Sequence, residues 1–183
     1  LEYITKLNKS LLLLSKIDNG QFTDTKELEL NVLLKQYLQD YEEVYDYRNI
    51  EVTIDEQGVF KVTMNESLAV ALLTNLLKNA FVHNIDGLDR SSAASDVYKR
   101  QVHNIDGGHI RITVTKNGIT FRNSGVEHPL NKEHIFERFY QGSKKEGSTG
   151  LGLAIADSIC RLQHLNIKYY FEQNEHCFEI SQS

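Results

Sequence analysis

The sequence predicts an α+β protein, a two-layer α/β sandwich preceded by one N-terminal helix. Segments with apolar residues at helical spacing alternate along the chain with segments in which apolar and polar residues alternate. The strand-like segments come in pairs separated by turn residues, which gives the order helix, hairpin, helix, hairpin, helix, hairpin. Such an order places strands in one layer and helices in the other.

The size and charge of the chain narrow the classes of protein to which it can belong. With 183 residues and 40% hydrophobic residues, it is expected to form one domain or one domain with an appendage. The net charge of -5 leaves no basic stripe for phosphates, so no nucleic-acid partner is expected. Cys160 and Cys177 have no metal-ligand spacing and are expected to be reduced, buried thiols. No apolar run approaches the length of a membrane span.

The first half of the chain predicts two helices and two strands. Residues 1–17 form a helix that either packs on its own domain or is half of a helical hairpin or coiled coil. Residues 26–47 predict a second amphipathic helix, with a short strand as an option before it. Residues 50–55 and 58–64 alternate across a turn at Gly58 and predict a pair of strands. The apolar stripe of the first helix consists of Ile4, Leu7, Leu11, Leu14 and Ile17.

The second half continues the same order. Residues 65–83 predict a strong helix, and residues 109–125 predict a hairpin about the turn Lys116-Asn117-Gly118. A helix follows from about Gly150 to Leu162. Two strands within residues 166–182 end the chain.

A direct repeat interrupts this plan. Residues 82–87 and 102–107 both read "VHNIDG", and the residues between them show little apolar periodicity. Removal of one copy and the intervening residues restores a compact helix, turn and strand. We therefore interpret about residues 87–101 as an insertion, neutral or artefactual in preference to a functional loop. Loop insertions of this size cost little closure entropy.

A cluster of glycines opens the helix in "EGSTGLGLAIADSIC", residues 146–160. A helix N-terminus exposes unpaired backbone N–H groups and the positive end of its dipole. Glycine residues at Gly147, Gly150 and Gly152 would let phosphate oxygens approach this backbone closely. The pattern predicts a phosphate cradle, the alternative being a flexible loop that closes on a helix cap. It matches neither the P-loop nor the dinucleotide fingerprint.

Two asparagines share one face of the helix of residues 65–83. Asn75 and Asn79 are one turn apart, and His83 lies a further turn along. Carboxamides on an otherwise apolar helix are costly to bury without polar partners. A hard cation, whose ligands are oxygens, is one such partner; a cap on a neighbouring loop is the alternative.

In their order and spacing, these motifs resemble those of sensor histidine kinases. Residues 75–83 resemble the N box and residues 123–125, "NSG", a degenerate adenine-contact box. Residues 135–140, "IFERFY", resemble the F box, and residues 147–154, "GSTGLGLA", the second glycine box. The resemblance covers roughly residues 1–180. It implies the Bergerat fold, which is a two-layer sandwich, with ATP and Mg²⁺ as ligands.

The resemblance also implies roles for individual residues. Asn79 would ligate Mg²⁺ that bridges the phosphates, with Lys78 and His83 near the phosphate tail. Asn123 and Gly125 would contact the adenine. The glycine-box residues implied to hold the nucleotide are Gly147, Thr149, Gly150, Leu151 and Gly152.

A lid of about residues 126–149 is implied to close over the nucleotide. Phe136 and Phe139 would anchor this lid, with Phe139 at the nucleotide, although both can equally be ordinary core aromatics. In the family the adenine box is usually Asp-x-Gly-x-Gly. Asn123 can still accept a hydrogen bond from the adenine amino group, but without the charge of a carboxylate.

One position helps to choose the reaction. Related ATPases carry a glutamate one turn before the Mg²⁺-binding asparagine, where it activates water. Here that position is Asn75, which cannot act as a general base. Phosphoryl transfer to a protein acceptor is therefore favoured over hydrolysis, and we assign Asn75 and Asn79 to the catalytic site.

The resemblance divides the chain into residues 1–20, the second helix of a truncated dimerisation hairpin, and residues 21–183, the ATP-binding catalytic domain. The histidines all lie in the second part, so the acceptor histidine is expected to be missing. The implied full-length parent is a homodimeric receptor in the bacterial inner membrane, with this domain in the cytoplasm. Its own dimerisation domain and a response regulator are the implied partners. A nucleotide-binding or protein-interaction module of the same fold without transfer activity stays open.

Overall fold

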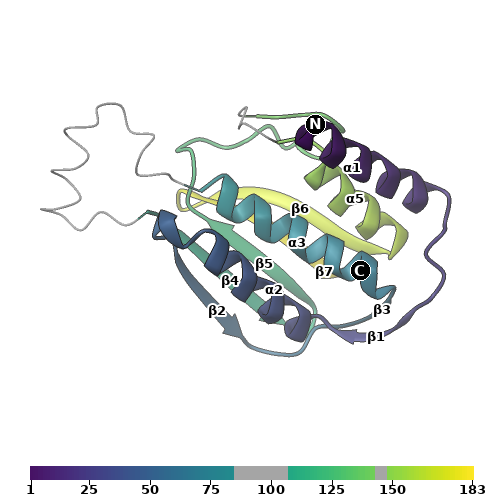
Figure 1. Cartoon of the computed structure of the whole chain (residues 1–183). Coiled ribbons are helices and arrows are strands. Elements are labelled where there is room, and N and C mark those ends of the chain that lie inside the picture. The colour runs from purple at the N-terminus through teal and green to yellow at the C-terminus, as the bar shows by residue number, and fades with distance from the viewer. Residues whose placement is uncertain (85–106, 143–147) are drawn as a thin grey trace, which may run out of the picture.

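The computed structural model describes residues 1–84, 107–142 and 148–183. Its centre is a five-stranded mixed sheet with helices over one face, which confirms the predicted two-layer architecture (Figure 1). The first strand pair in the order, β2 with β4, is parallel, and all the other neighbours are antiparallel. In spatial order the strands are β2 (Glu51–Glu56), β4 (His109–Thr115), β5 (Gly118–Asn123), β7 (Glu175–Gln182) and β6 (Leu165–Glu172).

The helical layer is built around α3 (Glu66–Val82), against which both α2 (Leu30–Val44) and α5 (Gly152–Leu162) pack. The side chain of Asn65 caps α3 by accepting a hydrogen bond from the Leu68 N–H at 3.2 Å. Apolar side chains on most sides of α3 are buried between its neighbours and the sheet, which makes it the core helix. They are Leu68, Ala69, Leu72, Leu73, Leu76, Leu77, Ala80 and Phe81.

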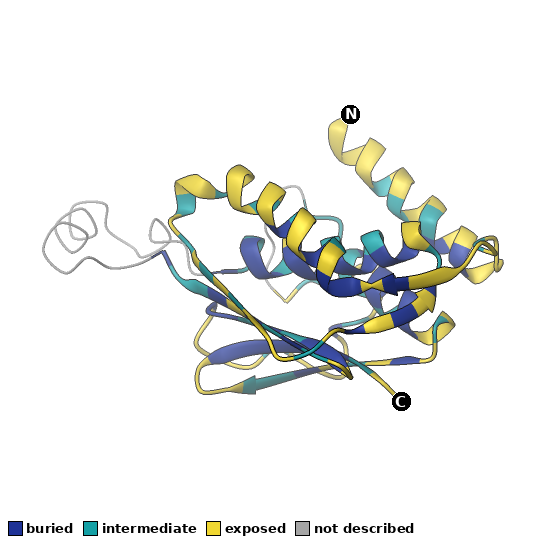
Figure 2. Ribbon diagram, turned by 90° about the horizontal axis from the view of Figure 1, so that it is seen from below, coloured by how far each residue is buried: buried dark blue, intermediate teal, exposed yellow. Residues whose placement is uncertain are grey.

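The N-terminal helix α1 (Glu2–Asp18) packs on α5 through its C-terminal half. Leu14 and Ile17 are buried, whereas the side chains of Ile4 and Leu11 in the same predicted stripe are exposed. Figure 2 shows the N-terminal part of α1 as largely exposed. No helix among the described residues is both long and apolar enough to cross a membrane.

Two of the predicted hairpins are confirmed. Strands β4 and β5 pair antiparallel about the turn at Lys116 and Asn117, and β6 pairs with β7. The second turn consists of Gln173 and Asn174, with φ angles of 51° and 62°. Positive φ at both central residues is the geometry that matches the twist of a two-residue hairpin.

The predicted hairpin at Gly58 is wrong, although both of its strands form. β2 pairs with β4, and β3 (Lys61–Met64) pairs antiparallel with a short strand β1 (Lys26–Glu29) beside the helical layer. Alternation of apolar and polar residues identifies a strand but does not determine which strand it pairs with.

The side chain of Asn31, in the first turn of α2, holds the crossing between β2 and β3. It is buried, and it donates to the Gly58 carbonyl at 2.9 Å and to Glu56 Oε1 at 3.0 Å. Its own oxygen accepts from the Phe60 N–H at 2.9 Å. The backbone that leaves the sheet therefore finds its hydrogen-bond partners on α2.

We expect Asn31→Ala to lower the free energy of unfolding by about 2 to 3 kcal/mol, because it leaves the buried Phe60 N–H without an acceptor. Chemical denaturation measures this loss. The exposed Asn166→Ala serves as the matched control and is expected to change stability by less than about 0.5 kcal/mol. Equal effects of the two substitutions would contradict this account of the crossing.

Candidate functional site

A cavity of about 960 Å³ lies where α3, the start of α5, the segment after β5 and the N-terminal half of α1 come together. Most of the residues expected at a nucleotide site line it: Asn75, Lys78, Asn79, His83, Asn123, Gly125, Thr149, Gly150 and Gly152. Gly147 and the proposed insertion at about residues 87–101 lie outside the described residues. Leu151 and Phe139 do not line the cavity.

The two asparagines of α3 face the cavity in different states. The Asn75 amide nitrogen donates to the Ala71 carbonyl of its own helix at 2.7 Å. Its oxygen is directed at the start of α5, where a Cβ added to Gly152 would lie 2.9 Å from it. The half-buried side chain of Asn79 has no hydrogen-bond partner within the described ranges. Asn79 thus has its whole carboxamide available for a ligand, whereas the nitrogen of Asn75 is engaged within α3.

At the end of β5, Asn123 presents a buried oxygen without a partner. Its Nδ2 donates to the Ser124 carbonyl at 2.9 Å, which fixes the orientation of the amide. Its Oδ1 is fully buried and accepts no hydrogen bond in the described structure. A buried acceptor without a donor costs about 1 to 3 kcal/mol. A ligand that brings an N–H group into the cavity would remove that cost.

Gly125 and Gly152 mark the two ends of the α3 wall of the cavity. A Cβ at Gly125 would lie 2.9 Å from the carbonyl oxygen of His83, so this close packing excludes a side chain. Gly152 lies against Asn75, eight residues earlier on α3 than His83. At 1.5 Å per residue this separation is about 12 Å along the helix. The cavity is therefore shaped for an extended ligand.

The glycine segment begins α5 without a side-chain cap. Leu151 is the N-cap residue and is fully buried, and no side chain accepts a hydrogen bond from the first turn. Gly152 and Leu153, whose N–H groups belong to that turn, line the cavity. A helix N-terminus in this state favours anionic groups. Leu151 contributes to the core and to the helix start rather than to the cavity surface.

Phe139 contacts Gly150 of the glycine segment through its backbone. Its N–H donates to the Gly150 carbonyl at 2.9 Å, and its own φ angle is 65°. Gly150 has a φ angle of 71°, and a Cβ at this position would lie only 3.0 Å from the Phe139 backbone. The Phe139 side chain is exposed. Phe136, by contrast, packs edge-on against Phe178 with ring centroids 6.3 Å apart, a contact that fits a lid anchor and an ordinary core aromatic equally.

A chain of hydrogen bonds ties the segment after β5 to the last hairpin. The Leu130 N–H donates to the Tyr169 hydroxyl at 2.9 Å, and this hydroxyl lies 2.8 Å from His176 Nδ1. His176 Nε2 lies 2.8 Å from the Val126 carbonyl oxygen, which can only accept. Nε2 must therefore carry the proton, and Nδ1 accepts from Tyr169. Burial lowers the pKa of His176 and keeps it in this neutral form.

The charges around the cavity are mostly positive. Three lysines line it, and Glu127 is the one carboxylate within the described lining. Burial first, and then the positive charge of Lys6, lowers the pKa of Lys78. The lysines that line the cavity are Lys6, Lys9 and Lys78.

The donor groups present fit a nucleotide with a cation better than a cation alone. The described residues contain no cluster of three His, Cys, Asp or Glu side chains that could hold a metal by themselves. Mg²⁺ usually keeps several waters and takes one or two protein ligands together with substrate phosphates. Asn79 provides one such oxygen, and Asn123 provides an acceptor for an amino group. The sites for Mg²⁺ and ATP are therefore compatible with these residues.

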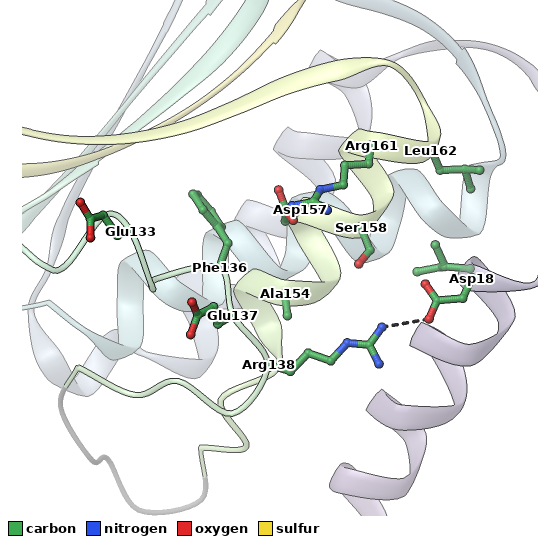
Figure 3. Close-up of a pocket in the computed structure, with 11 residues that line it drawn as sticks. Asp18, Glu133, Phe136, Glu137, Arg138, Ala154, Asp157, Ser158, Arg161 and Leu162 are labelled. Atoms are coloured by element: carbon green, nitrogen blue, oxygen red, sulfur yellow. Dashed lines mark hydrogen bonds and ion pairs between the residues drawn. The ribbon is translucent and has the colours of Figure 1, made fainter.

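Several residues of the site carried no signal in the sequence. Tyr45 and His176 line the cavity, as do Lys6 and Lys9 of α1. They lie far from the recognised motifs along the chain, and His176 occupies an ordinary strand position. A separate cavity of about 790 Å³ lies between the end of α1, residues 133–138 and α5 (Figure 3). It contains no residue predicted for the nucleotide site except Phe136 as a lid anchor.

Comparison with known proteins identifies related sequences. The model of the family of histidine kinase-, DNA gyrase B- and HSP90-like ATPases matches residues 64–180. The heme sensor protein HssS of Staphylococcus saprophyticus is 32% identical over 172 residues, covering 93% of this chain and 34% of that protein. HssS of Staphylococcus aureus strain Newman is 31% identical over 169 residues, covering 91% and 33%. The chain spans about a third of the length of these curated relatives.

Solved structures share the fold at lower sequence identity. The histidine kinase AdeS of Acinetobacter baumannii gives a TM-score of 0.70 at 18% identity, covering 98% of this chain and 77% of that one. The cytoplasmic segment of histidine kinase QseC gives 0.66 at 17% identity, covering 97% and 89%. The nucleotide-free catalytic domain of histidine kinase ThkA gives 0.66 at 23% identity, covering 86% and 94%.

We expect the network around His176 to make stability depend on pH. Its pKa in the folded state lies below the ordinary value of 6.5, so folding favours the neutral ring. This contribution is present above pH 6.5 and is lost as the pH falls from there through the folded pKa. Chemical denaturation at about pH 7.5 and at about pH 5, above and below the ordinary pKa of histidine, measures this loss in the free energy of unfolding.

The test compares three proteins: the native chain, His176→Gln, and the control His164→Asn, which changes an exposed histidine. The native chain and His164→Asn should lose stability on acidification by similar amounts. His176→Gln should lose less, because its side chain does not titrate. Parallel pH profiles for all three proteins would show that His176 has no such role.

Proposed function

The chain belongs to the family of histidine kinase-, DNA gyrase B- and HSP90-like ATPases, as a catalytic domain of the sensor histidine kinase type, and we propose that it transfers the γ-phosphate of ATP to a histidine of a dimerisation domain. One observation carries this proposal. A single elongated cavity combines a buried acceptor at Asn123 with an open carboxamide at Asn79 and an uncapped helix N-terminus at Gly152. These groups match the adenine, the metal and the phosphates of one nucleotide.

The nucleotide would lie along α3. The Asn123 oxygen would accept a hydrogen bond from the adenine amino group. The first turn of α5 and Lys78 would hold the phosphates, and Asn79 would provide an oxygen ligand for the metal. A bound Mg²⁺ would neutralise the negative charge of the phosphates. The chain itself positions the γ-phosphate and forms no covalent intermediate.

Transfer to a protein acceptor is preferred over hydrolysis because the described residues of α3 that line the cavity include no carboxylate to activate water. Asn75 occupies the position from which a glutamate would activate water, and its amide nitrogen is bound to Ala71. Within the described lining the one carboxylate is Glu127, two residues after the adenine box and not on α3. A histidine that attacks the γ-phosphate needs less help from a base than water does.

The acceptor and the partners belong to the proposed parent protein. Residues 1–20 would be the second helix of its dimerisation hairpin, and the acceptor histidine would lie on a helix outside this chain. The parent would be a homodimeric receptor of the bacterial inner membrane with this domain in the cytoplasm. A response regulator would receive the phosphoryl group.

We expect Asn79→Ala to weaken Mg²⁺-ATP binding at least about tenfold, because the metal loses its ligand from the chain. Isothermal titration calorimetry with Mg²⁺-ATP measures this loss. Binding of adenosine, which needs no metal, should be unchanged. Asn166→Ala is the control for an exposed asparagine. Undiminished Mg²⁺-ATP binding by Asn79→Ala would refute the assigned metal ligand.

Base selectivity tests the role of Asn123. Its nitrogen is engaged with the Ser124 carbonyl, so its oxygen can accept from the amino group of adenine but cannot donate to the O6 of guanine. We expect ATP to bind at least about tenfold more tightly than GTP, and Asn123→Ala to remove most of this preference. Competition calorimetry gives both ratios. Equal affinities for ATP and GTP in the native chain would exclude this recognition.

A further inference from the structure

The N-terminal helix α1 reaches the cavity because its C-terminal half is fixed on the domain. Leu14 and Ile17 are buried against it. At the helix end, Asp18 accepts a hydrogen bond from the Arg138 guanidinium at 2.9 Å, which joins α1 to the segment after β5 (Figure 3). Ile17 and Asp18 also line the second cavity beside α5. Burial of apolar side chains and the contact between Asp18 and Arg138 therefore both hold α1 in its docked position.

The side of α1 that packs on the domain also reaches the nucleotide cavity. Residues 6, 10, 13 and 17 succeed one another at intervals of three or four and so lie on one side of the helix. Ile17 at one end of this side is buried, and Lys6 and Ser10 at the other end line the cavity together with Lys9. The N-terminal half of α1 is otherwise largely exposed (Figure 2).

The lysines create an excess of positive charge in an acidic chain. The net charge of the chain is -5, yet Lys6, Lys9 and Lys78 face one cavity with Glu127 as the only described carboxylate in its lining. None of these lysines forms an ion pair with any residue in the described ranges. Burial lowers the pKa of Lys78, and repulsion by the positive charge of Lys6 lowers it further. Like charges placed this close are unfavourable until an anion lies between them.

The position of the cluster indicates which part of the ligand it meets. Lys78 neighbours Asn79 and lies one turn from Asn75, whose oxygen faces the start of α5. We propose that Lys6 and Lys9 of α1 bind the terminal phosphates of the nucleotide together with Lys78, so that α1 forms part of the ATP site. This inference rests on the proposed function of the cavity.

Docking of α1 and binding of nucleotide are then linked. A nucleotide that contacts Lys6 and Lys9 stabilises the docked position of α1, and the docked helix raises the affinity for the nucleotide by the same factor. The effect should grow with the number of phosphates, because adenosine has no charge for the lysines to meet. The opposing possibility is that these lysines are only the solvated face of the helix.

The test is calorimetry of Mg²⁺-ATP and adenosine with the native chain, the double variant Lys6→Gln/Lys9→Gln and the control Lys16→Gln. Lys16 is an exposed lysine of the same helix that lines neither cavity. We expect the double variant to bind Mg²⁺-ATP about five- to tenfold more weakly, as two partly exposed charge contacts would give. Its adenosine affinity and the Mg²⁺-ATP affinity of Lys16→Gln should match those of the native chain.

Other outcomes overturn the inference in distinguishable ways. Unchanged Mg²⁺-ATP affinity in the double variant shows that the lysines do not meet the phosphates. An equal loss in Lys16→Gln shows a general effect of charge, and an equal loss for adenosine shows a structural effect on the cavity. If the native chain binds no Mg²⁺-ATP at all, the proposed function itself fails.

Discussion

The geometry of the cavity depends on a hydrogen-bonded junction where α3 ends beside β5. Arg48 donates to the carbonyls of Phe81, Val82 and Asn84, and thereby satisfies the end of a buried helix. Asn84 Nδ2 donates to the His109 carbonyl at 2.9 Å, and the Ser124 hydroxyl bonds to Asn84 Oδ1. Gly108, with a φ angle of 99°, leaves no room for a Cβ beside these polar atoms. The junction fixes α3, and with it Asn79, relative to the end of β5.

Beside this junction, several groups that face the cavity lack interaction partners among the described residues. Asn123 lies immediately before Ser124, yet its buried oxygen has no donor within the described structure. The N-terminus of α5 has no side-chain cap, and like charges meet near Lys78. Each of these features costs stability in the unliganded chain. They share one cavity, and a single ligand with an amino group at one end and negative charge at the other relieves all of them. This coincidence is typical of a binding site rather than of a core.

The sequence allowed the prediction of features that depend on local periodicity. The helix of residues 65–83, the turn at Lys116 and Asn117 and the glycines before α5 were all recognisable because their signals lie within a few residues. The partners of β2 and β3 were not, since Asn31 holds the crossing through backbone groups more than 25 residues away. Local pattern also says nothing of pairs such as Tyr169 with Val126, joined through His176. For Phe139 the side chain is exposed, and its contact with Gly150 comes from the backbone N–H, which a side-chain motif does not reveal.

Of the two alternatives for the first helix, the structure shows packing on its own domain, and half of a dimerisation hairpin stays a proposal. Leu14 and Ile17 pack on the catalytic domain, while Ile4 and Leu12 keep exposed fractions of 56% and 57%. In the proposed dimerisation hairpin these exposed side chains would be covered. Their burial and the contact of Lys6 with the phosphates would then act on the same helix. Any movement of α1 that the hairpin imposes would therefore change the charge around the nucleotide, without any change in the residues of α3 or α5.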